Sequence, residues 1–537
     1  MCSAVTNDGC EVVSRRISSD CRFPVGNLNV EDFQLDKTAQ WIISRNFNQI
    51  GLQFPDELLG LAFRICKNIV SLTTKNCFIL GDSSYAGCCV DELAGQRFRI
   101  DALVHYGRAC LSPVVGRIPV LYVFGQIPRS ALPHSKSMRD IAAELCSLLA
   151  PNPASTKSAL IITYDFPYQD FAYSLYQSLL SQPQVAQDGS FWPVVWSEPH
   201  VIPPCESASC SPLGDQLPPA VFHRCARSFH ILHGPNEIPN PSWSLVYVGR
   251  NCNTEGNPLP FHRILTELPE ASRAQSCLLD PFSLSFEKST DVLQKTLRRR
   301  SYLIEKAKDA RCFGILIGTL SVKNYNAIVK RLQTLLKRAG RSYITLVVGR
   351  LNPAKLANIS ELDVLVIVAC PETSLLDSRD FLIPVITPFE LECALHSEFV
   401  DATETERMTR LWNGKNLCLD YQKLLPGGDL YLPENVVLPR ADQPREKLAD
   451  VSLITGKLHE LQNIGGDDHP HCELSLATQK EWTLVDKNTW DLFSSKAHRT
   501  WYGLDPQLGH TPVAQLQEGQ DGVPTHYSRN RNESETS

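Results

Sequence analysis

Cysteines at four positions have the spacing for metal chemistry: the adjacent Cys88 and Cys89, then Cys110, and much later Cys370. Each position follows a short apolar run that predicts a β-strand. Because the loops that follow parallel strands gather at one edge of an open α/β sheet, where ligands bind, these thiols could meet in one place. Only one of the adjacent pair is expected to face a shared metal, since neighbouring side chains of an extended chain point apart.

Three thiolates from separate loops can hold three irons of a 4Fe-4S cluster and leave the fourth iron open. Thiolates are the ligands that such soft iron–sulfide cores require. The residues alone leave two other interpretations open. Buried cysteines often serve only as small apolar side chains. A zinc site is the other possibility, and it requires a fourth cysteine or a histidine such as His105.

The composition indicates a globular protein of several domains. The chain has 537 residues, 43% hydrophobic and 20% charged, with a net charge of -6. This balance argues against nucleic acid as a partner. No apolar run reaches the ~20 residues of a membrane span, and the N-terminus lacks the pattern of a signal peptide. We therefore expect a cytoplasmic location, where most of the 19 cysteines stay reduced.

Strands alternate with helices along most of the chain, which predicts an α/β fold with parallel sheets and right-handed crossovers. Two regions have the same succession of strand, helix, strand, ligand-type loop and strand, which suggests an internal repeat that is weaker between them. The expected parts are an irregular segment 1–35, a first α/β unit 36–134, a second unit 135–265 with an irregular insertion 182–241, a third unit 266–396, a C-terminal extension 397–517 and a disordered tail 518–537.

The strands that define these units are short and apolar, and most are followed by turn residues. They are expected at Ile50–Phe54, Phe78–Leu80, Ile100–Val104 and Val120–Phe124 in the first unit, at Ala159–Thr163 and Ser244–Val248 in the second, and at Phe313–Ile317, Tyr343–Val348, Leu362–Val368 and Val385–Ile386 in the third. One helix is expected in the extension, at Glu404–Trp412.

Charged residues near these motifs have ordinary explanations. Asp91 and Glu92 are expected to cap a short helix. Arg298–Arg300, the densest basic run, is expected on a solvated helix face. The glycines form no nucleotide-binding fingerprint, and no Ser-His-Asp or paired-carboxylate arrangement stands out.

Several blocks of the sequence are similar to the diphthamide synthase family, in order from about residue 36 to 515. These blocks are Leu52–Asp56, Gly81–Asp91, Val104–Gly107, Ala109–Leu111, Pro353–Asn358, Ala369–Pro371 and Pro384–Leu391. Two later blocks, Val451–Gly456 and Trp501–Pro512, resemble the second, non-identical subunit of eukaryotic members.

The resemblance implies three similar α/β units around a pseudo-threefold centre. It also implies the first step of diphthamide synthesis, in which an iron–sulfur enzyme cleaves S-adenosylmethionine reductively and adds a 3-amino-3-carboxypropyl group to a histidine of translation elongation factor 2. Catalytic members of the family carry one cysteine in each of the three units.

This chain departs from that pattern in the second unit. Cys225 lies near the expected position, but its surroundings, Phe222–Ser228, do not match. A cluster would therefore use Cys89, with Cys88 as the alternative, together with Cys110 and Cys370 as ligands. We interpret the chain as the partner of a catalytic subunit in a heterodimer, with no catalytic residue of its own. It would relay electrons from a small iron protein to the catalytic subunit; the alternative is a cluster-free structural partner.

Overall fold

The computed structural model describes residues 29–434 with gaps, and little beyond them. The gaps are residues 82–86, 133–135, 150–157, 183–190, 209–211, 214–216, 234–242, 251–258, 268–275, 289, 350, 360, 376–380 and 397–416. After residue 434 only 450–451, 454, 458–459, 522–523 and 526–527 are described. The helix expected at Glu404–Trp412 therefore lies outside the described residues.

The chain divides into two compact units, residues 1–474 and 475–537. In the second of these, the described residues form one antiparallel pair, β19 (Gly522–Val523) with β20 (His526–Tyr527). This pair lies in the tail that was expected to be disordered. Within residues 1–474 a similar short pair, β17 (Asp450–Val451) with β18 (Leu458–His459), lies in the expected extension. All three large sheets lie within residues 1–474.

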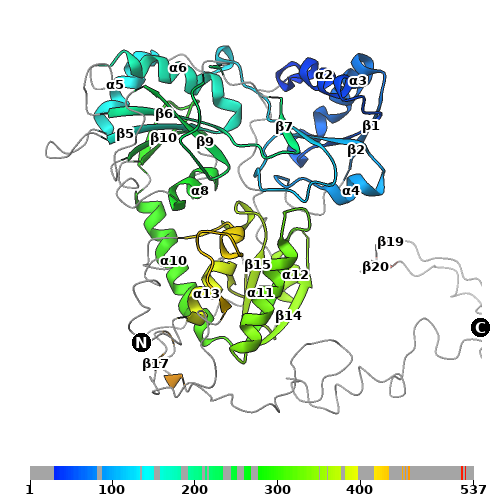
Figure 1. Ribbon diagram of the computed structural model, residues 1–537, viewed down its shortest axis with the longest axis vertical. Helices are drawn as coiled ribbons and strands as arrows, with labels where there is room; N and C mark the ends of the chain where they lie inside the picture. The colour runs from blue at the N-terminus through cyan, green and yellow to red at the C-terminus, as the bar shows by residue number, and fades with distance from the viewer. Residues whose placement is uncertain are drawn as a thin grey trace, which may run out of the picture. The chain divides into compact units, whose positions relative to one another are not determined.

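The first sheet has five parallel strands in the order β2-β1-β3-β4-β7. The strands are β1 (Gln49–Gln53), β2 (Asn76–Leu80), β3 (Ala102–Tyr106), β4 (Val120–Val123) and β7 (Cys205–Ser207). Its helices are α2 (Leu35–Ser44), α3 (Leu59–Thr73) and α4 (Glu92–Arg97), with short 3-10 turns η2 (Val30–Phe33), η3 (Asp56–Leu58) and η4 (Arg129–Ala131). The four strands expected here are confirmed, with α2 and α3 on one face and α4 on the other (Figure 1).

The third sheet has four parallel strands in the order β14-β13-β15-β16. They are β13 (Cys312–Ile317), β14 (Ser342–Val347), β15 (Val364–Val368) and β16 (Val385–Ile386). The helices are α10 (Thr290–Asp309), α11 (Tyr325–Arg338), α12 (Pro353–Ala357) and α13 (Pro388–His396), with the 3-10 turns η7 (Thr373–Leu375) and η9 (Tyr421–Leu424). Gly340, at φ +66°, follows α11 in the left-handed region that glycine favours, and so helps to end the helix.

The second sheet has seven strands in the order β12-β11-β10-β5-β6-β9-β8. They are β5 (Ser158–Tyr164), β6 (Phe191–Pro199), β8 (Phe222–Arg224), β9 (Arg227–His233), β10 (Trp243–Val248), β11 (Ser276–Leu279) and β12 (Phe286–Lys288). Its helices are α5 (Met138–Leu148), α6 (Gln169–Leu180) and α8 (Leu259–Glu267), with the turn η5 (Phe166–Tyr168).

Two expectations for this region were wrong. The insertion 182–241 is not irregular, because it supplies β6, β8 and β9 to the second sheet and β7 to the first. The second sheet also does not end before residue 265, because β11 and β12 join it. Polar residues such as Arg227 and Ser228 interrupt the apolar pattern of β9, and antiparallel pairing at a sheet edge tolerates such a sequence.

The three sheets share one order of central strands. In the first and third sheets the strands that come second, first, third and fourth along the chain lie side by side, as β2-β1-β3-β4 and β14-β13-β15-β16. In the second sheet β6-β5-β10-β11 repeats this order, and all of these pairs are parallel. The internal repeat expected from the sequence is therefore present in the strand topology of all three sheets.

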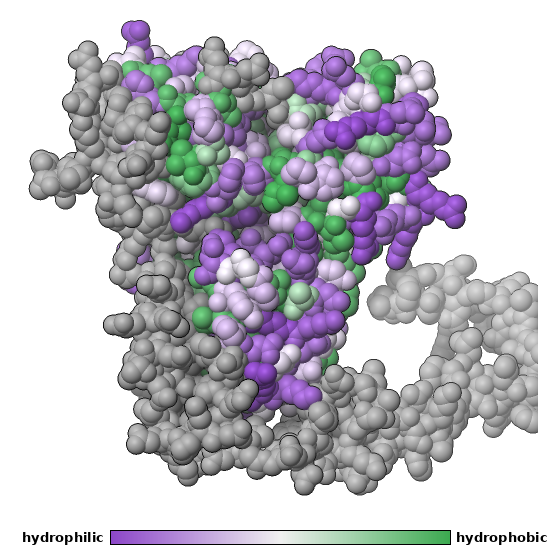
Figure 2. All heavy atoms as spheres, viewed as in Figure 1, coloured by the Kyte–Doolittle hydropathy of each residue, from purple (hydrophilic) through white to green (hydrophobic). Residues whose placement is uncertain are grey.

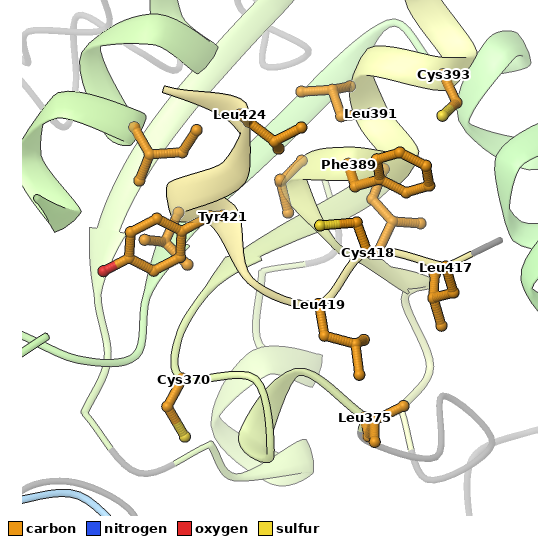
Figure 3. Packing of buried hydrophobic residues seen from close by; sticks show 14 of the residues in the cluster. Cys370, Leu375, Phe389, Leu391, Cys393, Leu417, Cys418, Leu419, Tyr421 and Leu424 are labelled. Atoms are coloured by element: carbon orange, nitrogen blue, oxygen red, sulfur yellow. The ribbon is translucent and has the colours of Figure 1, made fainter. Parts of the chain in front are cut away.

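Two large apolar cores connect these sheets. One core contains residues of α2 and α3 together with residues of α5 and α6, so it lies between the first and second sheets. The other contains residues of α8, α10, α11 and α13 together with Cys89, Cys110 and Cys370. Residues 417–425 also belong to this core, so the third unit extends past the boundary expected at residue 396 (Figure 3).

None of the helices in the described part of the chain is long and apolar enough to cross a membrane. The visible surface over α11 and α12 is mostly hydrophilic, whereas hydrophobic residues stand among hydrophilic ones over α3 and β2 (Figure 2).

Candidate metal centre

Four thiols meet where the loops of the first and third sheets come together. The sulfur atoms of Cys88, Cys89, Cys110 and Cys370 all lie within 4.8 Å of one another. The Sγ atoms of Cys88 and Cys370 are 3.8 Å apart, and those of Cys89 and Cys110 are 4.0 Å apart. The cysteines singled out in the sequence are thus brought together, although they are up to 282 residues apart in the chain.

The expectation that only one of Cys88 and Cys89 could face the shared site was wrong. It assumed an extended chain, but these two residues lie in a turn between β2 and α4. A turn does not impose the alternation of side chains that a strand does, so both sulfur atoms reach the group.

Gln53, the last residue of β1, holds the Cys88–Cys89 turn in place. Its side-chain Nε2 donates a hydrogen bond to the Cys89 carbonyl at 2.8 Å, and its side-chain Oε1 accepts one from the Asp91 N–H at 2.9 Å. The Cys110 N–H donates to the Cys88 carbonyl at 3.0 Å, which joins the two loops of the first sheet. Gln53 is buried, and sequence reasoning missed its role although it lies in a block used for the resemblance.

The two acidic residues after the turn lie at the start of helix α4, as expected. Asp91 caps α4 by accepting a hydrogen bond from the Ala94 N–H at 3.0 Å. Glu92 does more, because its Oε1 accepts from the N–H groups of Gly116 and Arg117 at 3.1 and 2.9 Å. Glu92 therefore fastens the segment that runs from Cys110 into β4.

Cys370 follows β15 and begins a tight turn. The Thr373 N–H and hydroxyl lie 3.4 and 3.2 Å from the Cys370 Sγ, and the Ser374 hydroxyl donates to the Cys370 carbonyl at 3.0 Å. In Figure 3 the Cys370 sulfur points away from the apolar group around Phe389. The turn thus holds the thiol at the margin of the core, where it meets the loops of the first sheet.

A buried ion group joins elements of all three sheets beside the thiols. Arg108, in the Cys110 loop, lies 2.9 Å from Glu372, which is two residues after Cys370. Arg263 of α8 donates to the Cys110 carbonyl at 2.9 Å and lies 4.0 Å from Glu372. Burial raises the pKa of Glu372, and the charges of Arg108 and Arg263 oppose that shift. Sequence reasoning missed Arg263 because nothing in the sequence of α8 distinguishes it from a surface arginine.

The thiols influence one another's ionisation. Hydrogen bonds with Cys110, the largest cause, and with Cys370 raise the pKa of both Cys88 and Cys89 well above the ordinary cysteine value. Hydrogen bonds from Cys110, Cys88 and Cys89 lower the pKa of Cys370 well below that value. The group therefore favours a thiolate at Cys370, and a thiolate is the form in which cysteine binds a metal.

His105 and Cys225, which the sequence offered as possible site residues, do not belong to the four-thiol group. His105 is fully buried in β3 with its ring 5.6 Å from that of Tyr122, and the only metal-type group in the described residues consists of cysteines. Cys225 lines a shallow hollow together with Cys110, and its Sγ lies 3.8 Å from the Arg263 carbonyl. Neither residue supplies a ligand atom to the four-thiol group.

The donor set fits a metal centre that uses soft ligands. Thiolates suit iron–sulfur clusters and zinc, whereas magnesium and calcium prefer oxygen. Cys89, Cys110 and Cys370 are 2%, 4% and 0% exposed, so a bound centre would be shielded from water. Four thiols within 4.8 Å of one another, three of them buried, are also more than a well-packed core requires, which argues for ligands rather than apolar filling.

Comparison with known proteins identifies the class. A family model for diphthamide synthesis proteins matches residues 54–405, and the chain belongs to this family. The curated relatives include 2-(3-amino-3-carboxypropyl)histidine synthase subunit 2 from Danio rerio, 34% identical over 99% of this chain and 98% of the relative. The subunit of the same name from Xenopus laevis is 32% identical over 93% of this chain and 92% of the relative.

Among solved structures, the crystal structure of Dph2 from Pyrococcus horikoshii with a 4Fe-4S cluster aligns with a TM-score of 0.46. It is 18% identical and covers 67% of this chain and 90% of that chain.

Proposed function

We propose that the chain is the iron–sulfur subunit of a heterodimeric transferase for the first step of diphthamide biosynthesis. This enzyme transfers a 3-amino-3-carboxypropyl group from S-adenosylmethionine to a histidine of translation elongation factor 2. Cys89, Cys110 and Cys370 hold a 4Fe-4S cluster, with Cys88 as the alternative to Cys89. The observation that carries the proposal is the convergence of these sulfur atoms within 4.8 Å from loops of two different sheets.

A bound 4Fe-4S cluster supplies one-electron transfer. The chain's own residues prepare its site: Gln53 and Thr373 fix the two cysteine turns, and Arg263 holds the Cys110 loop. Hydrogen bonds to sulfur and exclusion of water tune the potential of such a centre. The subunit then relays electrons from a small iron protein to the catalytic subunit and contributes no catalytic residue.

The arrangement proposed for the chain is three α/β units around a pseudo-threefold centre at the thiols. Its support is the strand order that all three sheets share and the contacts of Arg108 and Arg263 with Glu372, which join the Cys110 loop, helix α8 and the Cys370 turn. The expected bounds 36–134, 135–265 and 266–396 are extended accordingly: β11 and β12 belong to the second unit, and residues 417–425 belong to the third. The cytoplasm is the proposed location.

A structural zinc site is the second candidate, because four thiols rather than three are in reach. Zinc–sulfur bonds of ~2.3 Å in a tetrahedron place sulfur atoms ~3.8 Å apart. The observed contacts of 3.8 and 4.0 Å agree with that spacing. The chain would then be a cluster-free structural partner of the catalytic subunit.

The test is the content of iron, sulfide and zinc, with the visible spectrum, of the chain purified without oxygen. We expect about four irons and four sulfides per chain. Cys370→Ala should remove the iron and the visible absorption. Cys146→Ala, which changes a thiol that is 2% exposed in α5 and outside the group, should leave both unchanged. A colourless chain with about one zinc would overturn the cluster and establish the structural site.

The relay needs its own measurement, because a cluster could be present without transferring electrons. With the catalytic subunit and a small iron-protein reductant, Cys89→Ala, Cys110→Ala and Cys370→Ala should each reduce turnover. Turnover that is unaffected by all three substitutions would refute the relay.

A further inference from the structure

We infer that strand β2, with the helices α3 and α4 beside it, forms the surface on which a non-identical subunit of the same family docks. β2 is the outermost strand of the first sheet. Strands of parallel sheets are usually covered on both faces. In β2, however, Phe78 and Ile79 are 40% and 37% exposed, and their side chains lie on opposite faces of the strand.

A stripe of apolar residues along α3 borders this strand. Leu59, Phe63, Cys66 and Val70 follow one another at helical spacing, so they lie on one face of α3. Phe63 is 72% exposed, the highest fraction among the exposed large apolar residues of the described part of the chain. The Cys66 Sγ lies 3.9 Å from the Cys77 carbonyl, which places the stripe directly against β2.

Phe98 follows α4, the helix on the other face of the first sheet, and is 61% exposed. We define the β2 edge surface as Leu59, Phe63, Val70, Phe78, Ile79 and Phe98. Figure 2 shows hydrophobic residues among hydrophilic ones in this part of the molecule. A group of exposed apolar residues of this size marks an interaction site more often than a bare surface.

The equivalent edge of the second sheet shows how such an edge is covered. There β6 has the position of β2, and β9 pairs with it in antiparallel fashion, followed by β8. Within the described residues no strand pairs with the outer side of β2. An unpaired strand edge offers backbone N–H and C=O groups that a partner's strand can bind.

The third sheet provides the contrast that makes β2 distinctive. β14 is also an outermost strand, and its Val347 is 66% exposed. The helix beside it, α11, exposes Lys330, Lys337 and Arg338 rather than an apolar stripe. The two edges therefore differ in their flanks, which are aromatic and apolar beside β2 and basic beside β14.

Charge determines which partner fits. The exposed charged residues of α3, and of α4 with the turn after it, are all basic: Arg64, Lys67, Arg97 and Arg99. A second copy of this chain, docked through the same surface about a twofold axis, would bring these like charges together. The surface therefore fits a non-identical chain that presents acidic residues around an apolar strand edge.

This inference rests on the proposed function, in which the partner is the catalytic subunit. It adds a reason why that partner would receive electrons. Cys88 lies eight positions after Leu80, the last residue of β2, so a subunit that pairs with β2 docks beside the strand that leads into the thiol group.

The experiment measures the affinity of the full chain for the catalytic subunit by sedimentation. Phe63→Glu with Phe98→Glu should weaken binding by more than about tenfold, since buried aromatic anchors dominate interface energies. The matched control is Val347→Glu, equally exposed at the edge β14, which should change the affinity less than about twofold. Circular dichroism checks that the variants fold, as expected for side chains this exposed.

Wild-type affinity in the double variant would overturn the inference and leave the heterodimer standing. No binding by the wild-type chain would overturn the heterodimer, and the inference with it. A wild-type chain that forms a homodimer, which Phe63→Glu dissociates, would overturn the choice of partner. Arg64→Glu with Arg97→Glu should slow association and reduce its dependence on salt, because complementary charge acts mainly on the association rate.

Discussion

The second sheet differs from the first and third in what its loops carry, although all three have the same order of central strands. In the first and third sheets the loop after the third strand provides a thiol, Cys110 or Cys370. Within the described residues the second sheet provides no thiol to the site and instead places Arg263 against the Cys110 carbonyl. Strand order depends on buried apolar runs and crossovers, so the loops can change their chemistry without changing the fold.

The edges of the first and second sheets also differ. The insertion in the second sheet covers β6 with the antiparallel strands β9 and β8, whereas β2 of the first sheet has no described strand on its outer side. One copy of the repeat thus completes its edge within the chain. The other leaves an edge that a partner can complete. The contrast shows that the copies of the repeat share their order of central strands but differ in their loops and edges.

The largest effect is expected where the second sheet meets the other two, at Glu372. Glu372→Ala removes the carboxylate that faces both Arg108 and Arg263, whose side chains are 20% and 7% exposed. Removing one partner of a buried ion pair costs roughly 3 to 5 kcal/mol. We expect the free energy of unfolding, measured with urea, to fall by about this amount.

An exposed ion pair provides the control for that change. Arg45 and Glu206 lie 2.6 Å apart with side chains 55% and 39% exposed. Glu206→Ala should therefore cost no more than about 1 kcal/mol. Equal losses in Glu206→Ala and Glu372→Ala would mean that the three sheets are not held together by the buried group.

A second effect depends on pH and compares His105, in β3 of the first sheet, with His262, in helix α8 beside the second sheet. Burial lowers the pKa of His105 and of His262 to about 4. In the unfolded chain a histidine titrates near 6.5, so between about pH 6.5 and 4 the unfolded state binds more protons. Stability should therefore fall as the pH falls through this range, by up to about 3 kcal/mol for each histidine, and should not depend on these groups above it.

Unfolding free energies measured at several pH values check this expectation. His105→Asn and His262→Asn should each make the decline below pH 6.5 shallower. If the decline of the unfolding free energy with pH in His105→Asn equals that of the wild type, the His105 imidazole is charged in the folded protein. Its burial then does not lower its pKa.

Much of the fold was predictable from sequence because apolar runs define the central strands. The strands around Ile50, Leu103, Ile315 and Val366 were all expected, and their side chains are buried. The antiparallel strands β8, β9 and β12 were missed, since such strands require no continuous apolar run, and the parallel strands β6, β7 and β11 were missed as well. Arg300 shows the same limit: it was expected in solvent, but it is 5% exposed and lies 3.2 Å from the buried Glu390.

The site was predictable to the extent that it follows from topology. Cys89, Cys110 and Cys370 were expected to meet because loops after parallel strands share an edge, and their sulfur atoms do meet. The contribution of Cys88 could not be predicted, because it depends on a turn rather than a strand. Arg263 and Glu372 depend on contacts between sheets that no local pattern encodes.

The smallest effect distinguishes a thiol of the second sheet from those of the site. Cys277 lies in β11, fully buried, and burial raises its pKa to about 12, so it remains a neutral thiol. Cys277→Ser places a hydroxyl among apolar neighbours, which should cost about 1 to 3 kcal/mol of unfolding free energy. The metal content per chain should stay at the wild-type value, whereas Cys370→Ser should lose the metal. If Cys277→Ser also lost metal without unfolding, a cysteine of the second sheet would belong to the centre, and the division of tasks among the three sheets would have to be redrawn.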